Sequence, residues 1–318
     1  MADVAGQVEA YIAFKQALGV KMTSAASALR QFARYAAEHG HVGPVDVDIA
    51  VAWASSGSGH SHGYEAVRYG YARRVAAFSR AFDKGLPELP EGLFGKGYLR
   101  VTPHVFSDED VSLLAYAASR MEAADPLAPL SHAALIGILS ATGMRPSEAL
   151  GLADADIDLS AGTVLVNDSK GTTRLLPIGG GTVAALEEYL GRRESLRSGR
   201  SHGRLLLAAS SKPLALHSAE RAFECYRGIL LGRGQLWEGR APRLFDLRHT
   251  FAVKTILKWH AGGEDVGSML PVLATYMGHA HIGQTYWYLT GAPELMEMAA
   301  AAFGALGACG EGPYEEAV

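Results

Sequence analysis

Cysteine is scarce in this chain: Cys225 and Cys309 are the two among 318 residues. They form no metal or redox motif, so we expect neither structural disulfides nor a cysteine-bound metal. No apolar run is long enough to span a bilayer, and the N-terminus lacks the basic region and hydrophobic core of a secretory signal. These absences predict a cytoplasmic protein with no membrane partner.

Positive charge is also in short supply. The formal net charge is −4, whereas proteins that bind nucleic acid usually carry a basic footprint. Residues 1–100 hold 11 Lys+Arg against 9 Asp+Glu, a net of +2, and residues 101–318 hold 18 against 24, a net of −6. The arginines cluster locally, which permits phosphate binding on an acidic chain. One cluster is Arg68, Arg73, Arg74 and Arg80, and another is Arg192, Arg193, Arg197, Arg200 and Arg204.

Metal-binding patterns are incomplete. His60 and His62 lie in a Gly/Ser-rich loop without a third ligand, and His279 and His281 have no acidic or cysteine partner nearby. A metal site usually combines three or four ligands, so solvated histidines are the better interpretation. No phosphate-binding P-loop is present either. We expect no metal and no cofactor.

The pattern of apolar residues predicts a mainly α protein of two domains. Residues 1–90 read as a bundle of about four helices, covering 7–38 as two helices, then 47–53 and 64–82. Residues 86–103 are rich in Pro and Gly, and we place the linker at residues 91–106. Residues 107–300 form the second domain, which Ser107 opens as a helix cap, and residues 301–318 form an acidic tail.

The second domain contains one clear β stretch. Residues 163–166 and 174–178 are apolar and flank Asn167–Thr173, which predicts a hairpin with Lys170 on its turn. Helices are expected at 183–190, at 214–231 and at 270–277, the last ending at Gly278. Residues 192–204 read as a basic loop. Residues 294–306 are alanine-rich and apolar and read as a further helix.

Two arginines stand at the start of expected helices. Arg145 follows the apolar helix that ends near Gly143, and Pro146 then starts a new helix, a position that proline tolerates. Arg248 lies in the first turn of a helix for which Asp246 is the expected N-cap. Helix N-termini and guanidinium groups both favour an anion such as phosphate. A surface arginine on an ordinary helix is the alternative for each taken alone.

These residues belong to a larger set of motifs. In order, the chain has an A-T-G-x-R-x-S-E-x-L box at 141–150, an L-R-H-T-F-A box at 247–252, Gly278-His279 and a T-x-x-Y that selects Tyr288. On this reasoning we expect Tyr286 to be a core residue. Together the motifs resemble the signature of the tyrosine recombinases, or phage-integrase-type recombinases, over about residues 106–295. The residues around the tyrosine look most like the transposon-encoded branch.

The resemblance implies a fold and a reaction. It implies a helical, SAM-like core-binding domain, and an α-rich catalytic domain with a small β-hairpin. The implied catalytic residues are Arg145, Lys170, Arg248, His279 and the nucleophile Tyr288. In the family, the tyrosine forms a 3′-phosphotyrosyl bond while the hairpin lysine protonates the leaving 5′ oxygen. Such proteins bind double-stranded DNA and assemble as a homo-tetramer on paired sites, with accessory proteins in some systems. We place DNA contacts at Arg68, Arg73, Arg74, Arg80, Arg174 and His249.

One position departs from the family pattern. The usual motif is H-x-x-R-H, and this chain has Phe245 where the first histidine belongs. That histidine is thought to help accept the tyrosine's proton, and phenylalanine cannot carry one. General acid–base assistance is typically worth about 10²–10⁴-fold, so its loss need not abolish the reaction. Two other functions stay open: a DNA-binding accessory factor with weakened catalysis, and a type IB-like topoisomerase.

Overall fold

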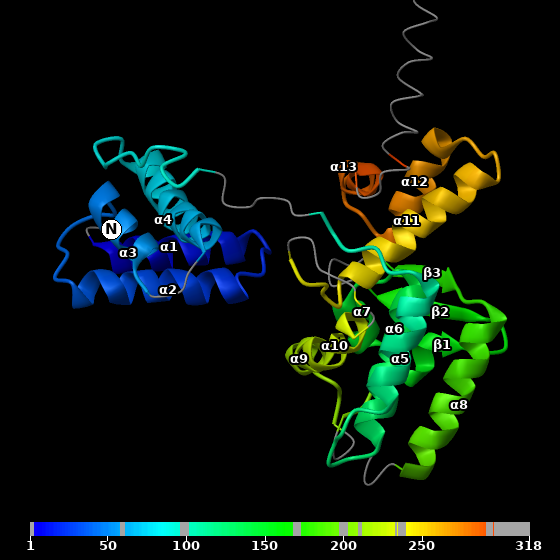
Figure 1. Ribbon diagram of the computed structural model, residues 1–318. Coiled ribbons are helices and arrows are strands. Elements are labelled where there is room, and N and C mark those ends of the chain that lie inside the picture. The colour runs from blue at the N-terminus through cyan, green and yellow to red at the C-terminus, as the bar shows by residue number, and fades with distance from the viewer. Residues whose placement is uncertain are drawn as a thin grey trace, which may run out of the picture. The chain divides into compact units, whose positions relative to one another are not determined.

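The computed structural model describes residues 3–57, 61–95, 102–167, 173–196, 203–208, 212–232, 234, 240–290 and 295. The chain divides into two compact units, residues 1–100 and 101–318. The division falls inside the segment 91–106 that we expected as a linker. Figure 1 shows the elements of each unit.

The first unit is a bundle of four helices. Helices α1 (Val4–Ala17), α2 (Thr23–Glu38), α3 (Val47–Ser55) and α4 (His62–Phe82) match the expected segments within a few residues. Asp3, Asp46 and Ser61 cap three of them by accepting a backbone N–H, as such residues do at helix starts. Leu29, Phe32 and Trp53 lie in the core, at most 2% exposed.

Helix α6 is the centre of the second unit. It spans Leu127–Thr142 and packs against α5 (Asp108–Ser119) and α7 (Pro146–Gly151) (Figure 1). Ser107 and Asp110 form the expected capping box at the start of α5. At the end of α6, Gly143 adopts φ +61°, a left-handed conformation that stops the helix and that glycine enters without strain. Pro146 then starts α7, as predicted.

The sheet has three antiparallel strands in the order β1–β2–β3. The hairpin of β2 (Thr163–Asn167) and β3 (Thr173–Pro177) was predicted, with Leu165 opposite Leu175. The short strand β1 (Ile157–Asp158), which follows the 3₁₀ helix η1 (Asp154–Asp156), was not. A strand of two residues is too short to show the alternation of apolar and polar side chains by which a strand is recognised from sequence.

Helix α8 runs further than the sequence suggested. It spans Gly180–Leu196, so residues 192–196 are helical and the expected basic loop at 192–204 is wrong in that part. The physical reason lies at Arg193, which is 3% exposed and forms an ion pair with Asp154 from η1. A distant partner thus stabilises the last turn. Helices α9 (Leu216–Tyr226) and α10 (Gly228–Leu231) occupy the expected helical segment.

Helices α11 and α12 bring the later motifs together. Helix α11 spans Asp246–Ala261 and packs on α6; α12 spans Val266–Met277 and ends at Gly278, as predicted (Figure 1). The short helices α13 (Gly283–Tyr286) and η3 (Trp287–Thr290) follow. Asp246 is not the N-cap of α11. It is the first helical residue and is fully buried, where it accepts hydrogen bonds from Arg240 and from the backbone N–H of Arg243.

The chain is therefore mainly α with a small antiparallel sheet, as the sequence predicted. Among the described residues, no helix combines the length and the apolar character needed to cross a membrane.

Candidate active site

Arg145 lies at the junction of α6 and α7. Its Nη1 donates to Glu148 Oε1 at 2.7 Å, and its Nη2 donates to the carbonyl of Gly278 at 2.9 Å. Glu148 also accepts the backbone N–H of Arg145. The i, i+3 spacing on the first turn of α7 allows this double contact. The side chain stays 28% exposed, so its guanidinium group is both oriented and accessible.

Arg248 is held inside the protein, 1% exposed. Its Nη1 donates to the carbonyl of Gly143 at 2.8 Å, and its Nη2 donates to the carbonyl of Met277 at 2.6 Å. Both acceptors lie at helix ends, where carbonyl groups lack partners within the helix. Arg248 therefore ties the end of α6 to the end of α12. Burial lowers the pKa of its guanidinium from the usual value, an effect that nearby Tyr288 opposes.

Arg174 on β3 joins the same cluster. Its Nη2 donates to Glu148 Oε2 at 3.0 Å. Its Nε and Nη1 are buried and have no hydrogen-bond partner among the residues that the structure describes. Gly278 makes room for it, because a Cβ there would lie 2.0 Å from Nη1. Arg145 and Arg174 thus share one carboxylate, and Arg248 lies close enough to feel its charge. This convergence of three guanidinium groups is suited to a bound anion.

Tyr288 lies beside this cluster. It is 3% exposed, and its hydroxyl oxygen lies 3.4 Å from His279 Nε2. Arg248 Nη2 lies 2.9 Å from the same nitrogen, and His279 Nδ1 lies 2.7 Å from Thr285 Oγ1. Burial raises the pKa of Tyr288, and the charge of Arg248 opposes that rise. Burial, followed by the charges of Arg248, Arg145 and Arg174, lowers the pKa of His279 to about 4.

Phe245 and His249 complete the surroundings of the tyrosine. The ring of His249 lies edge-on to Phe245 at 5.3 Å and to Tyr288 at 5.2 Å between centroids. His249, for which a DNA contact was predicted, lies against the tyrosine. Burial lowers its pKa to about 4, although Asp246 acts in the opposite direction.

One prediction about the tyrosines is wrong. Tyr286 was interpreted as a core residue, yet it is 48% exposed while Tyr288 is buried. The 3₁₀ helix η3 places residue 288, rather than residue 286, on the protein-facing side. Spacing in the sequence does not determine this.

The structure thus brings together Arg145, Arg174, Arg248, His279 and Tyr288. Lys170 lies outside the described residues, as do His60, Arg197, Arg200 and the apolar segment 296–306. Glu148 and Thr285 were given no role from sequence, although both belong to the motifs, Glu148 in the first box and Thr285 as the threonine of T-x-x-Y.

The remaining predicted DNA contacts belong to the first unit. Arg73 and Arg80 line a hollow of about 480 Å³ together with Lys84. Arg74 is exposed on the same helix. Arg68, another predicted DNA contact, is mostly buried. It is 9% exposed, donates to the carbonyl and hydroxyl of Ser56 and stacks on Trp53, so it stabilises the bundle.

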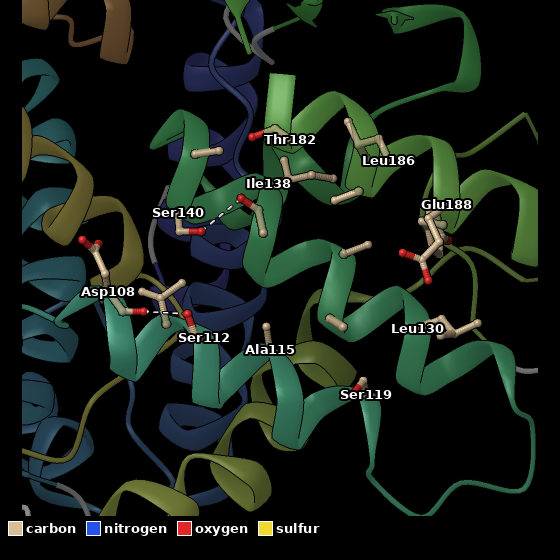
Figure 2. Close-up of a pocket in the computed structure, with 18 of the residues that line it drawn as sticks. Asp108, Ser112, Ala115, Ser119, Leu130, Ile138, Ser140, Thr182, Leu186 and Glu188 are labelled. Atoms are coloured by element: carbon tan, nitrogen blue, oxygen red, sulfur yellow. Dashed lines mark hydrogen bonds between the residues drawn. The ribbon is translucent and has the colours of Figure 1, made fainter. Parts of the chain in front are cut away.

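A larger cavity of about 700 Å³ lies between α5, α6 and α8, with Arg192 and Lys254 among the residues that line it. Figure 2 shows its walls, where Ala115, Ile138 and Leu186 are apolar and Asp108 and Glu188 lie on different sides. Phe251 from α11 lines it, whereas Arg248 and His249 do not. None of the residues clustered around Tyr288 lines this cavity, so the two are separate features of the unit.

Gly143 gives a prediction for stability. An alanine there would combine a positive φ with a Cβ 2.3 Å from a ring atom of Phe251. We expect Gly143→Ala to lower the free energy of unfolding by about 2 kcal/mol or more in urea denaturation. Gly179→Ala is the control, since nothing lies within 4 Å of a Cβ there and its φ is not positive. An equal loss of unfolding free energy in Gly143→Ala and Gly179→Ala would contradict this prediction.

Known proteins share this arrangement of motifs. The model of the phage integrase family matches residues 107–294. The provisionally named integrase/recombinase y4rB of Sinorhizobium fredii is 33% identical over 297 residues, 92% of this chain and 94% of that protein. This chain belongs to the phage integrase family. It is a tyrosine-type site-specific recombinase.

Two further likenesses agree with the membership. The tyrosine recombinase XerD of Mycobacterium tuberculosis is 34% identical over 183 residues, 57% of this chain and 54% of that one. The fold resembles a structure of the Tn1549 transposon integrase in complex with a circular intermediate DNA, with a TM-score of 0.66. That match has 16% identity and covers 91% of this chain and 95% of the other.

Proposed function

We propose that this phage integrase family member cuts and rejoins DNA by transesterification, with Tyr288 as the nucleophile and a 3′-phosphotyrosyl intermediate. The observation that carries the proposal is the convergence of three guanidinium groups beside a buried tyrosine hydroxyl. A phenol is a weak nucleophile because its pKa is about 10. It needs a phosphate whose negative charge is neutralised, and a cluster of arginines supplies that electrostatic stabilisation.

The three arginines would have different roles at the phosphate. Arg145 is partly exposed and would take one non-bridging oxygen of the phosphate. Arg248 presents Nη2 beside His279 and Tyr288, where a second oxygen would lie. Arg174 adds positive charge through nitrogens that have no partner among the described residues. Glu148 orients Arg145 and Arg174 and touches neither reacting atom.

The leaving group also needs a proton. By resemblance to the family, Lys170, which lies between β2 and β3 in the sequence, would protonate the departing 5′ oxygen. The phosphotyrosyl ester keeps the energy of the broken bond, so the 5′ hydroxyl of a partner strand can reverse the step without ATP. The scheme also requires no metal ion, because arginines carry out the charge neutralisation.

The first unit would hold the duplex. Arg73, Arg74 and Arg80 lie on α4, and Lys84 follows that helix. Arg73 pairs with Glu91 and Arg80 with Glu88, and phosphates would replace these carboxylates when DNA binds. We assign residues 1–90 to DNA binding, 91–106 to a linker, 107–300 to catalysis and 301–318 to a tail. Exchange of strands between two sites requires four cleavages, so we propose a homo-tetramer on paired sites, with accessory proteins as possible partners.

Covalent trapping tests the proposal. The protein is incubated with nicked suicide DNA carrying the ends of its own element, and the denaturation-resistant adduct is digested and mapped by mass spectrometry. We expect the nucleotide on Tyr288. An adduct on another residue, or none from protein that binds the DNA, would overturn the proposal. Recovery of the adduct by Phe245→His would then favour the accessory factor, and relaxation of plasmids without site preference would favour a topoisomerase.

A further inference from the structure

The chain has phenylalanine where the family pattern has a histidine, which raises the question of what accepts the proton of Tyr288. Two histidines touch the tyrosine. His249 meets it ring against ring, and its Nδ1 is buried without a hydrogen-bond partner among the described residues. His279 directs a ring nitrogen at the tyrosine oxygen, 3.4 Å away. A general base must lie within reach of the proton, and distances in the absence of substrate are often long.

The partners of His279 determine its tautomer. Arginine has N–H groups and no acceptor, so the contact of 2.9 Å requires that Arg248 donates to Nε2. The proton of the neutral ring therefore resides on Nδ1, which donates to Thr285 Oγ1 at 2.7 Å. Thr285 is fully buried, and its backbone is held by the carbonyl of Ile282. In this tautomer Nε2 is an acceptor and cannot donate to a phosphate.

We propose that His279, oriented by Thr285, is the general base for Tyr288 in this chain and replaces the histidine that Phe245 has displaced. The inference rests on the proposed function. When a phosphate binds, Arg248 turns its N–H from Nε2 to a non-bridging oxygen, and the nitrogen becomes available to the tyrosine. The base is thus free when the substrate is in place.

The proton balance of the step is complete. The Tyr288 proton moves to His279 Nε2 as the tyrosine oxygen bonds to phosphorus and the bond to the 5′ oxygen breaks. The 5′ oxygen takes a proton from the general acid, for which Lys170 is the candidate. The imidazolium then donates Nε2–H to a non-bridging oxygen. In the reverse step a 5′ hydroxyl attacks, and Nε2 returns its proton to the tyrosine.

The charges around His279 keep its ring unprotonated. The groups that face it come from four elements: Arg248 and His249 from α11, Arg145 from the start of α7, Arg174 from β3 and Tyr288 from η3. With burial, they lower the pKa of His279 to about 4. A base with a lowered pKa is neutral, and therefore active, above that pKa, and it loses function as pH falls through it. Cleavage by the wild type should therefore vary by less than about twofold between pH 6 and 8.

The test is the pH dependence of cleavage by His279→Gln on the suicide substrate. Glutamine retains an N–H donor and cannot accept the proton. At pH 7 we expect a rate about 10²–10⁴-fold below wild type. The rate should rise about tenfold per pH unit up to pH 9, because the phenolate fraction of a tyrosine with a raised pKa rises by that factor. His281→Gln, an exposed histidine two residues away, is the matched control and should behave as wild type.

Thr285 is a positioning residue and gives an independent readout. Thr285→Val removes the acceptor of Nδ1–H at similar volume, so both tautomers become available and cleavage should fall about tenfold. Thr285→Ser retains the oxygen and should restore the rate. If Thr285→Val and Thr285→Ser both slow cleavage, Thr285 has a packing role, and the positioning role is contradicted.

The outcomes separate the two proposals. If the wild type forms no adduct, the proposed function fails. If the wild type forms an adduct and His279→Gln is slowed equally at every pH, His279 serves as a phosphate contact or a structural group, and this inference alone is overturned. If the cleavage rate of His249→Gln rises with pH and that of His279→Gln does not, the general base is His249.

Discussion

Tyr288→Phe should bind its DNA site and form no covalent adduct. The substitution removes one oxygen atom and leaves the ring that packs against His249 and within the cluster of Ile256, Leu270 and Met277. The fold should therefore persist, whereas no oxygen remains to attack the phosphate. We expect adduct formation to fall below detection on suicide DNA, with a change of less than about threefold in the dissociation constant for DNA.

Tyr286→Phe is the matched control for that experiment. Tyr286 lies two residues earlier and is 48% exposed, so removal of its hydroxyl should leave adduct formation at the wild-type level. The reverse result, with loss in Tyr286→Phe and retention in Tyr288→Phe, would show that the T-x-x-Y spacing and the buried geometry both selected the wrong residue.

Arg248→Lys should also produce a large effect. Lysine keeps the positive charge, but its single ammonium group cannot reach the carbonyls of Gly143 and Met277 and the ring of His279 together, as the planar guanidinium does. We expect cleavage to slow by about 10²–10³-fold, the effect of removing one oriented donor from a charge-stabilising site. Unsatisfied buried carbonyls should also lower the free energy of unfolding by about 1–3 kcal/mol, measured in urea.

Arg227→Lys separates the loss of stability from the loss of catalysis. Arg227 also donates to a backbone carbonyl, that of Pro242, at 2.6 Å. Its substitution should lower the stability of the same unit and leave the rate of cleavage per folded molecule unchanged. If Arg248→Lys cleaves at the wild-type rate once corrected for folded protein, Arg248 is a structural tie between α6 and α12 and nothing more.

Local signals predicted much of the fold. Ser107 starts α5, Gly143 and Gly278 end α6 and α12, and Pro146 starts α7, because caps and breakers act within one turn of the chain. The predictions that were wrong concern residues whose place depends on contacts beyond one turn of the chain. Asp246 resembles an N-cap in sequence, but its carboxylate is drawn to Arg240, which a local pattern cannot reveal.

The sequence by itself determined the family of this protein, the order of its motifs and the ends of its main helices. These depend on residue types at short spacing. Only the tertiary structure decided that Glu148 links Arg145 to Arg174, that His279 Nε2 lies 3.4 Å from the Tyr288 oxygen, and that Tyr288 rather than Tyr286 is buried. The physical reason is separation along the chain. The contacts that set the site join residues such as Arg145 and Gly278, or Arg248 and Gly143, which lie 133 and 105 positions apart.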